Sequence, residues 1–177
     1  MPTPTTTPAA KLTLAQRRER EHLRACAHEA GHAVLMAHYN LPITEAIATV
    51  NNPIFFDPQA FGYVSEDHEP DDTHIPAELI DDYIVTYLAG GEAQAQWMHQ
   101  AEGMELAEAR REALYNSGSD YEVVRRYRRN SDLSLAQLQA RTAGLVRRRW
   151  AGITRVAAAL HRHKRLTGPQ ILALLGR

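Results

Sequence analysis

The distribution of apolar and polar residues divides the chain into helical and strand-like segments. Residues 14–39 contain no proline and are rich in Ala, Leu, Arg and Glu, which favour helix, and Asn40 and Pro42 supply the stop signal. Residues 43–50 and 61–66 are short runs with the β-branched or aromatic residues that are typical of strands. The pattern therefore predicts a long N-terminal helix followed by two short strands.

The rest of the chain is predicted to be helical. Helices are expected over residues 76–100, 104–114, 133–163 and 171–175. Pro76 suits the first helical position, and Ser119-x-x-Glu122 has the spacing of a capping box for one more helix. Gly90 and Gly91 lie inside the first of these helices, where they let another backbone approach closely. The predicted fold class is mainly α (α+β), with a small two- or three-stranded sheet near the N-terminal third.

Length and composition fit one globular domain. The chain has 177 residues, of which 44% are hydrophobic and 23% charged, and this length buries enough surface to fold without disulfides. Residues 1–12, rich in Pro and Thr, are predicted to be a disordered tail before a single domain over residues 13–177. The single cysteine, Cys26, excludes an internal disulfide, and no apolar run approaches the ~18 residues of a membrane span. We expect a cytoplasmic protein without a membrane span.

The net charge of −1 conceals two segments of opposite charge. Residues 57–122 contain 16 acidic and 2 basic residues, whereas residues 123–165 contain 12 basic residues and one acid. Nucleic acid is not the expected partner, because arginines spread along helices commonly form a solvated face or neutralise an acidic segment of the same fold. The alternative is that the Arg-rich C-terminal helices contact nucleic acid or an acidic partner.

The chemistry-bearing motif is His28-Glu29-Ala30-Gly31-His32, an H-E-x-x-H sequence inside the first predicted helix. Residues four apart lie on one helical face, so both imidazoles can bind one metal ion, and zinc suits two imidazoles and a carboxylate. Glu29 lies at the edge of that face, where it can take a proton from the attacking water. A solvent-facing histidine pair is the alternative, but the small apolar neighbours of the motif indicate a buried helix, where unpartnered imidazoles are costly.

H-E-x-x-H supplies two ligands, so the third must come from elsewhere in the chain. His38 has the spacing of the extended motif H-E-x-x-H-x-x-G-x-x-H, but apolar residues stand where that motif needs a glycine-enabled turn. Cys26 and His22 point away from the face that carries His28 and His32, and Cys26 is expected to be a small buried apolar residue. The remaining candidates belong to the acidic segment and stay open: Asp81, Asp82, Glu92, Glu105 and Asp120.

The order of several short motifs is similar to that in a known family. The motifs come in this order: HEAGHAVL, a predicted strand, FGYV, TYLAGGEAQA and SGSDYE. The segment AAALHRHKRLTGPQILALL follows near the C-terminus. Over residues 25–175 the chain resembles the peptidase domain of FtsH-type ATP-dependent zinc metalloproteases. The resemblance implies a helical zincin-like domain in which His28, His32 and Asp120 bind zinc and Glu29 is the catalytic base. It thus implies a zinc-dependent endopeptidase acting on flexible or unfolded polypeptide.

The chain departs from this family in ways that limit the resemblance. It has no G-x-x-x-x-G-K motif and hence no expected ATP binding, Gly91 stands where the family has a basic residue, and residues 97–115 look like an insertion. Asp120 also follows Ser119 at a predicted helix start, where the helix dipole favours any aspartate. The alternative to an enzyme is a catalytically weak or inactive zincin-fold binding or regulatory protein. In an enzyme, an extended substrate is expected to add to the sheet edge along residues 61–65.

Overall fold

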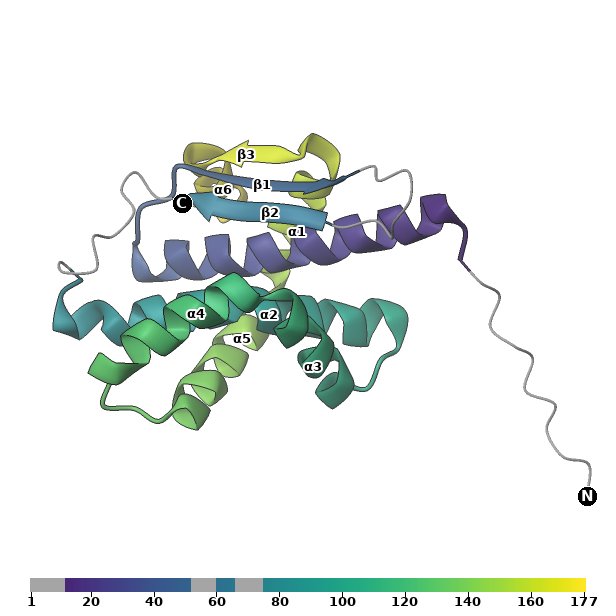
Figure 1. The fold of residues 1–177 in the computed structure, drawn as a ribbon. Coiled ribbons are helices and arrows are strands. Elements are labelled where there is room, and N and C mark those ends of the chain that lie inside the picture. The colour runs from purple at the N-terminus through teal and green to yellow at the C-terminus, as the bar shows by residue number, and fades with distance from the viewer. Residues whose placement is uncertain (1–11, 52–59, 66–74) are drawn as a thin grey trace, which may run out of the picture.

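The fold of the chain is mainly helical, with a small antiparallel sheet on one side (Figure 1). The computed structural model describes residues 12–51, 60–65 and 75–177, so almost all of the predicted tail lies outside the described residues. In chain order the elements are α1 (Leu14–Tyr39), β1 (Glu45–Val50), β2 (Ala60–Ser65), η1 (Ala77–Leu79), α2 (Ile80–Glu102), α3 (Leu106–Asn116), α4 (Gly118–Tyr127), η2 (Arg128–Asn130), α5 (Leu135–His163), β3 (Arg165–Thr167) and α6 (Gly168–Leu174). The prediction of a mainly α (α+β) fold is confirmed. Within the described ranges, none of the helices has the combination of length and apolar surface that crossing a bilayer requires.

The helix α1 has the predicted bounds because both of its ends are capped. Thr13 and Gln16 form a capping box, in which each side chain accepts a hydrogen bond from the backbone N–H of the other residue. At the other end, Asn40 adopts a left-handed conformation with φ 57°, and its N–H donates to the carbonyls of Ala37 and Met36. The helix that carries the H-E-x-x-H motif is thus defined at both ends by local hydrogen bonds.

The sheet joins segments from both ends of the described chain. The strand order is β2-β1-β3, and both pairs are antiparallel, with Glu45 opposite Ser65 in one pair and opposite Thr167 in the other. Strands β1 and β2 confirm the two predicted strands, whereas the third strand comes from the C-terminal region and not from the N-terminal third. The backbone N–H of Gly168 donates to the carbonyl of Thr44 at 2.8 Å and docks the chain beside β1. A strand of three residues is stabilised by this tertiary pairing, so its own sequence pattern does not reveal it.

One predicted helix start is wrong, although the other predicted helices are confirmed to within a few residues. Ser119 and Glu122 do not form a capping box, because both lie inside α4, whose N-cap is Ser117. The Ser117 hydroxyl donates instead to the carbonyl of Ala113 at 2.8 Å, in the last turn of α3. Only Ser117 lies between the two helices. Its side chain bonds to the end of α3 and does not cap the backbone N–H groups of α4.

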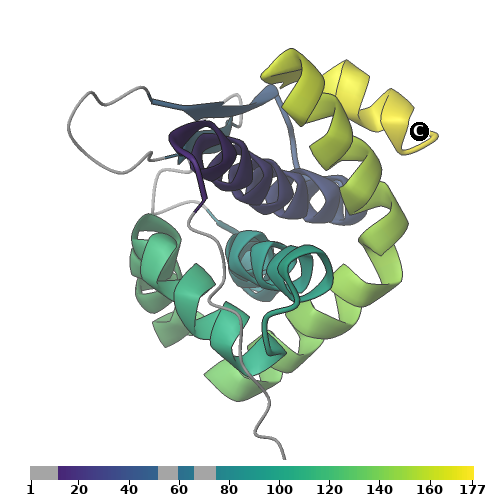
Figure 2. The ribbon, with the colours of Figure 1, turned by 90° about the vertical axis from the view of Figure 1, so that its right-hand side faces the viewer.

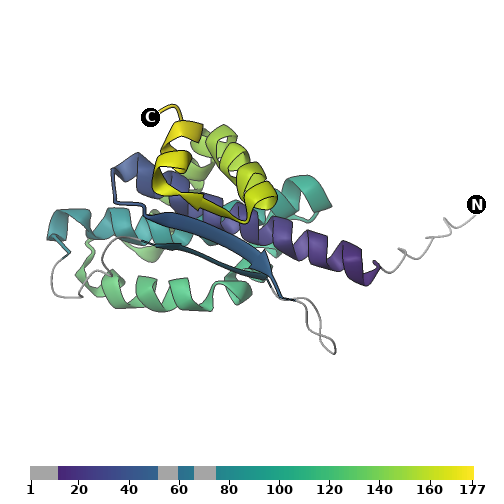
Figure 3. The same cartoon turned by 90° about the horizontal axis from the view of Figure 1, so that it is seen from above.

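The helix α1 lies in the middle of the molecule, with the sheet on one side and α2 on the other (Figure 1). Figure 2 shows α5 crossing beside both helices, and Figure 3 shows the strands lying over α1. The largest cluster of buried apolar side chains fills the space between these elements and includes Leu35, Ile84, Leu138 and Ile153. Cys26 belongs to this core, as predicted, and burial raises the pKa of its thiol to about 12. The helix with the motif is therefore held rigidly from several sides.

A buried arginine attaches α3 to α1. Arg24 is only 5% exposed, and its Nε and Nη2 donate to the two carboxylate oxygens of Glu102, at the end of α2, at 2.7 and 2.5 Å. Its Nη1 donates to Glu112 of α3 at 2.6 Å. Burial acts to lower the pKa of Arg24, but the surrounding carboxylates outweigh it and keep that pKa above its usual value. Residues 97–115, which look like an insertion in the sequence, are thus fixed to the motif-bearing helix.

The closest approach of α1 to α2 is made at Gly31. A Cβ at this position would clash with the backbone of Ala89 and the side chain of Ala93 in α2. Ala30 and Ala33, on either side of the same region, are fully buried. Small side chains on both helices therefore allow the two backbones to come close enough for α2 to reach the motif.

We expect Gly31→Ala to lower the free energy of unfolding by about 1–3 kcal/mol, because the added methyl group has to push α1 and α2 apart. The matched control is Gly118→Ala at the exposed start of α4, where a Cβ would meet no heavy atom within 4 Å. That change should be neutral or slightly stabilising. Urea titrations of both metal-free variants measure the difference, and equal losses of stability would contradict the close helix contact.

Candidate metal centre

The motif side chains and one distant aspartate meet between three helices. His28 and His32 lie one turn apart on α1 and face α2, which is the geometry that a spacing of four residues imposes on a helix. Asp120 reaches them from the first turn of α4, although it is 92 residues from His28 in the sequence. The site thus depends on tertiary packing of α4 against α2 and not on the local motif alone.

The polar atoms of these three side chains converge on one point. Nε2 of His28 lies 3.0 Å from Nε2 of His32 and 3.0 Å from Oδ2 of Asp120, and Nε2 of His32 lies 3.4 Å from the same oxygen. In the part of the chain that the structure describes, they form one of two groups whose ligand atoms are close enough to hold a metal ion. The sequence leaves five carboxylates as candidates for the third ligand, and Asp120 is the one that the fold brings to the histidines.

Hydrogen bonds to the outer ring nitrogens orient both imidazoles. Nδ1 of His32 donates to the carbonyl oxygen of Thr86 at 2.8 Å, and Nδ1 of His28 donates to Oε1 of Gln94 at 3.1 Å. A neutral imidazole carries one proton, so these bonds leave both Nε2 lone pairs directed toward each other and toward the carboxylate of Asp120. Such an arrangement is repulsive unless protons or a cation lie between the three groups. A metal ion fits this donor set.

Two glycines provide the space for the site. A Cβ at Gly90 of α2 would overlap the Nε2 atoms of both histidines, and a Cβ at Gly62 of β2 would overlap the carboxylate of Glu29. The sequence predicts that Gly90 and Gly91 admit another backbone, but the structure places two imidazoles against Gly90. At Gly91 the nearest atom to a Cβ is a serine hydroxyl oxygen, 3.3 Å away. Of the two glycines, Gly90 is therefore the one on which the geometry of the candidate metal centre depends.

Burial and the attraction between His32 and Asp120 have opposite effects on the pKa values of these two side chains. Burial raises the pKa of Glu29, which is 5% exposed, although positive charge on the two histidines opposes the shift. Burial also disfavours the charged forms of His32 and Asp120, but their attraction outweighs it. The pKa of His32 rises to about 9, and that of Asp120 falls below its usual range. In the metal-free protein His32 therefore holds a proton at neutral pH, which a metal ion must displace.

The centre opens into a cleft of about 490 Å³. One wall is formed by Gly62, Tyr63 and Val64 of β2, and Tyr87 of α2 also lines the cleft. Both histidines, Glu29 and Asp120 face the same space. A molecule in the cleft can therefore reach the metal centre, in contrast to a metal site enclosed within a core.

The other acidic candidates lie elsewhere in the fold. Asp82 and Glu92 form ion pairs with arginines, at 2.6 and 2.5 Å respectively. Asp81 accepts a hydrogen bond from a serine hydroxyl at 2.5 Å, and Glu105 is the N-cap residue of α3. His38 contacts an arginine of α5 at 3.0 Å, away from the motif, as the sequence predicts. The structure brings none of these five described residues to the centre.

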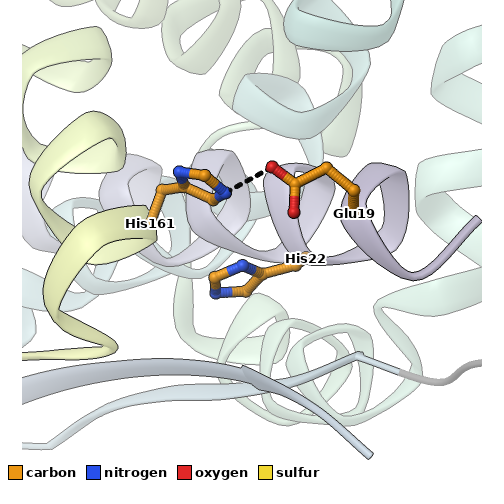
Figure 4. A group of neighbouring side chains, drawn as sticks. All are labelled: Glu19, His22 and His161. Atoms are coloured by element: carbon orange, nitrogen blue, oxygen red, sulfur yellow. Dashed lines mark ion pairs between the residues drawn. The ribbon is translucent and has the colours of Figure 1, made fainter. Parts of the chain in front are cut away.

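A second group of possible ligands lies between α1 and α5, and Figure 4 shows its three side chains: Glu19, His22 and His161. His161 forms an ion pair with Glu19 at 2.7 Å, drawn as the dashed line. Nε2 of His22 donates to the carbonyl of Ala48 at 3.0 Å, and its Nδ1 accepts from the ammonium of Lys164 at 3.0 Å. Since the lysine already places a positive charge there, this group connects the two helices and does not match a cation site.

Sequence reasoning missed the residues that position the metal-facing side chains. Gln94 lies four residues after Gly90, so both belong to one face of α2, and that spacing is a signal that could have found Gln94. The carbonyl of Thr86 carries no such signal, because every residue has one. The role of Gly62 depends on β2 passing over Glu29, which is a tertiary contact. These positions become apparent only in the folded chain.

Comparison with known proteins does not identify the chain. No protein-family model matches the sequence, and no curated protein matches it significantly.

We expect Gly90→Ala to weaken zinc binding by more than about tenfold, because the new methyl group has to displace both imidazoles from the ligand position. Gly91→Ala is the matched control, since a Cβ there meets only a hydroxyl oxygen that can shift. Competition against a chromophoric chelator measures both zinc affinities. If the two variants bind zinc equally well, the histidines do not meet at Gly90 as described.

Zinc binding should release about one proton per ion at neutral pH, because the metal has to replace the proton on His32, whose pKa is about 9. The apparent affinity then falls by about tenfold for each unit of pH between about 8 and 6. Calorimetry in buffers with different ionisation enthalpies counts the released protons. Asp120→Asn removes the charge that raises the pKa of His32 and should reduce the proton release. An affinity that does not change with pH would contradict this arrangement.

Proposed function

We propose that this chain is a zinc-dependent endopeptidase. The observation that carries the proposal is the convergence of His28, His32 and Asp120 beside the buried carboxylate of Glu29, at the wall of an open cleft. Two imidazoles and one carboxylate form a donor set typical of catalytic zinc sites, which keep a fourth position for water or substrate. A structural zinc site would instead be closed by a fourth protein ligand.

The chain supplies a base in the position that peptide hydrolysis needs. When bound, zinc would act as a Lewis acid that polarises the scissile carbonyl and makes the attacking water more acidic. Glu29 takes a proton from the water as its oxygen bonds to the carbonyl carbon, and gives it to the amine nitrogen as the C–N bond breaks. Burial raises the pKa of Glu29, which makes it a stronger base near neutral pH. The products are a carboxylic acid and an amine, and water is the only co-reactant.

The edge strand β2 offers a place for the substrate backbone. In the order β2-β1-β3 it is an outer strand, and its residues Gly62, Tyr63 and Val64 line the cleft. An extended polypeptide that pairs with this edge would pass in front of Glu29. Backbone pairing accepts most side chains but requires an extended segment. The proposed substrate class is therefore flexible or unfolded polypeptide.

The resemblance to the peptidase domain of FtsH-type proteases supports the same proposal. It implies the same two histidines, the same base and Asp120 as the third ligand. In the structure the ligand atoms of His28, His32 and Asp120 lie close together, and Glu29 lines the same cleft. ATP-driven unfolding is not part of the proposal, because this sequence contains no G-x-x-x-x-G-K motif. A substrate that is already unfolded, or a partner that unfolds it, would have to supply the extended segment.

We expect Glu29→Gln to reduce hydrolysis of a fluorescently labelled unfolded protein by more than about 100-fold, because the base is lost. Zinc content should stay near one ion per chain, since the ligands are unchanged. Asp120→Ala should lose both the zinc and the activity. Zinc analysis and the release of fluorescence, measured on the same samples, separate these two effects.

The matched control is Glu105→Gln, which removes an exposed carboxylate from the start of α3 and should change neither zinc content nor hydrolysis. Hydrolysis that survives in Glu29→Gln, or that a zinc chelator does not inhibit, would contradict the proposal. A wild-type chain that binds zinc without hydrolysing any unfolded protein would instead indicate a binding or regulatory protein on the same scaffold.

A further inference from the structure

The helix α5 carries a row of arginines and no acidic residue. Its 29 residues include six arginines but neither Asp nor Glu. Four of the arginines recur at every seventh position, which places them along one side of the helix: Arg141, Arg148, Arg155 and Arg162. All four are exposed. We refer to these four residues as the α5 arginine row.

Little in the fold neutralises this row. Arg141 forms an ion pair with Asp82 at 2.6 Å. Within the described residues, Arg148, Arg155 and Arg162 have no carboxylate as an ion-pair partner. An ordinary solvated helix face carries both signs of charge, whereas this one carries only positive charge. The sequence favours two explanations for these arginines: they neutralise the acidic segment, or they form an ordinary solvated face. Neither explanation accounts for Arg148, Arg155 and Arg162.

Two members of the row line a cavity of about 460 Å³ between α1, α5 and the C-terminus. Among the described residues its lining contains no carboxylate and includes four arginines: Arg148, Arg149, Arg155 and Arg177. Nε of Arg155 donates to the carbonyl of Leu174 at 3.1 Å, and Nη2 of Arg177 donates to the side-chain oxygen of Asn40 at 2.5 Å. These bonds hold the guanidinium groups at the cavity, so the cost of ordering them for an anion is reduced.

The cavity and the metal centre lie on opposite sides of α1. Val34 and Ala37 line the cavity, whereas His28 and His32 line the cleft. At 100° per residue, Val34 points about 160° away from His32. Figure 2 shows α5 and α6 together along one side of α1. A ligand of the arginine row would therefore leave the proposed active site accessible.

We propose that the α5 arginine row binds the phosphate backbone of a double-stranded nucleic acid, with one phosphate seated in the cavity between Arg148 and Arg155. The planar guanidinium group matches phosphate oxygens in pairs, and it keeps its charge at every physiological pH. Contacts of this kind are independent of base sequence. The proposal does not depend on the endopeptidase function, and it replaces the expectation that nucleic acid is not a partner.

The spacing of the row favours a duplex over a flexible anion. Seven residues of helix are about 10.5 Å long, so the three unpaired arginines span roughly 21 Å on a rigid support. A duplex presents phosphates at fixed positions, whereas an acidic peptide has no fixed spacing of its carboxylates. Single strands are usually bound through stacking of bases on aromatic rings. Among the described residues, the cavity lining has no phenylalanine, tyrosine or tryptophan, and its one aromatic ring, the imidazole of His38, already contacts Arg149 at 3.0 Å. This lining favours a duplex over a single strand.

The test is the binding of the full 177-residue chain to a fluorescein-labelled 30-base-pair DNA duplex, a duplex RNA of equal length, a single strand and polyglutamate. We expect binding to a duplex whose affinity falls steeply with salt. Arg148→Gln/Arg155→Gln should weaken it by about tenfold and reduce the slope of log affinity against log salt by about two. The DNA and RNA arms decide which duplex is preferred.

The matched control is Arg111→Gln/Arg129→Gln, which removes the same charge from exposed positions outside α5 and should weaken binding much less. Equal thermal unfolding and equal zinc content of the two double variants show that neither effect comes from misfolding. The proposal is overturned if no duplex binds at low salt or if both double variants weaken binding equally. It is also overturned if polyglutamate or the single strand binds as tightly as the duplex. Because no outcome uses hydrolysis, failure here and failure of the endopeptidase proposal are separate results.

Discussion

The close contact between α1 and α2 is the constraint on which the rest of the molecule depends. Gly31 lets the backbone of α2 approach α1 at Ala89, and the next residue of α2, Gly90, lies directly against the two imidazoles of the motif. The same helix then supplies Thr86 and Gln94 to orient those rings. Packing of the core and geometry of the candidate metal centre are thus set by one interface. A change that separates these helices would affect the stability of the fold and the arrangement of the candidate ligands together.

Features with local causes were predictable from the sequence, and features with tertiary causes were not. The bounds of α1 follow from its caps, and the placement of two histidines on one face follows from helix periodicity. The third candidate ligand was not predictable in this way. The residues alone left five carboxylates as candidates, and only the family resemblance favoured Asp120. The pairing of β3 with β1 and the space left by Gly62 depend on residues far away in the chain. No local pattern encodes such contacts.

The two charged segments take different places around α1. The acidic segment contributes Asp120 on the side of the cleft, where a carboxylate favours a bound cation. The basic segment contributes α5, whose arginines line a cavity on the opposite side of the same helix. The near-zero net charge therefore conceals a carboxylate at the cleft and a group of arginines at the cavity, while Asp82 and Arg141 pair the two segments directly. Attraction of a cation and attraction of an anion can occur on the molecule independently.

The position of β3 has a consequence for the order in which the molecule is made and folded. Strand β1 is synthesised before α2, but its second neighbour is formed by residues 165–167, which follow α5 in the chain. Until those residues are made, the central strand keeps an open edge, and long-range pairing of this kind is slow to form. The sheet whose other edge borders the cleft is therefore completed only after the long helix α5 has been made. This wall of the cleft is expected to be one of the later parts of the described fold to become fixed.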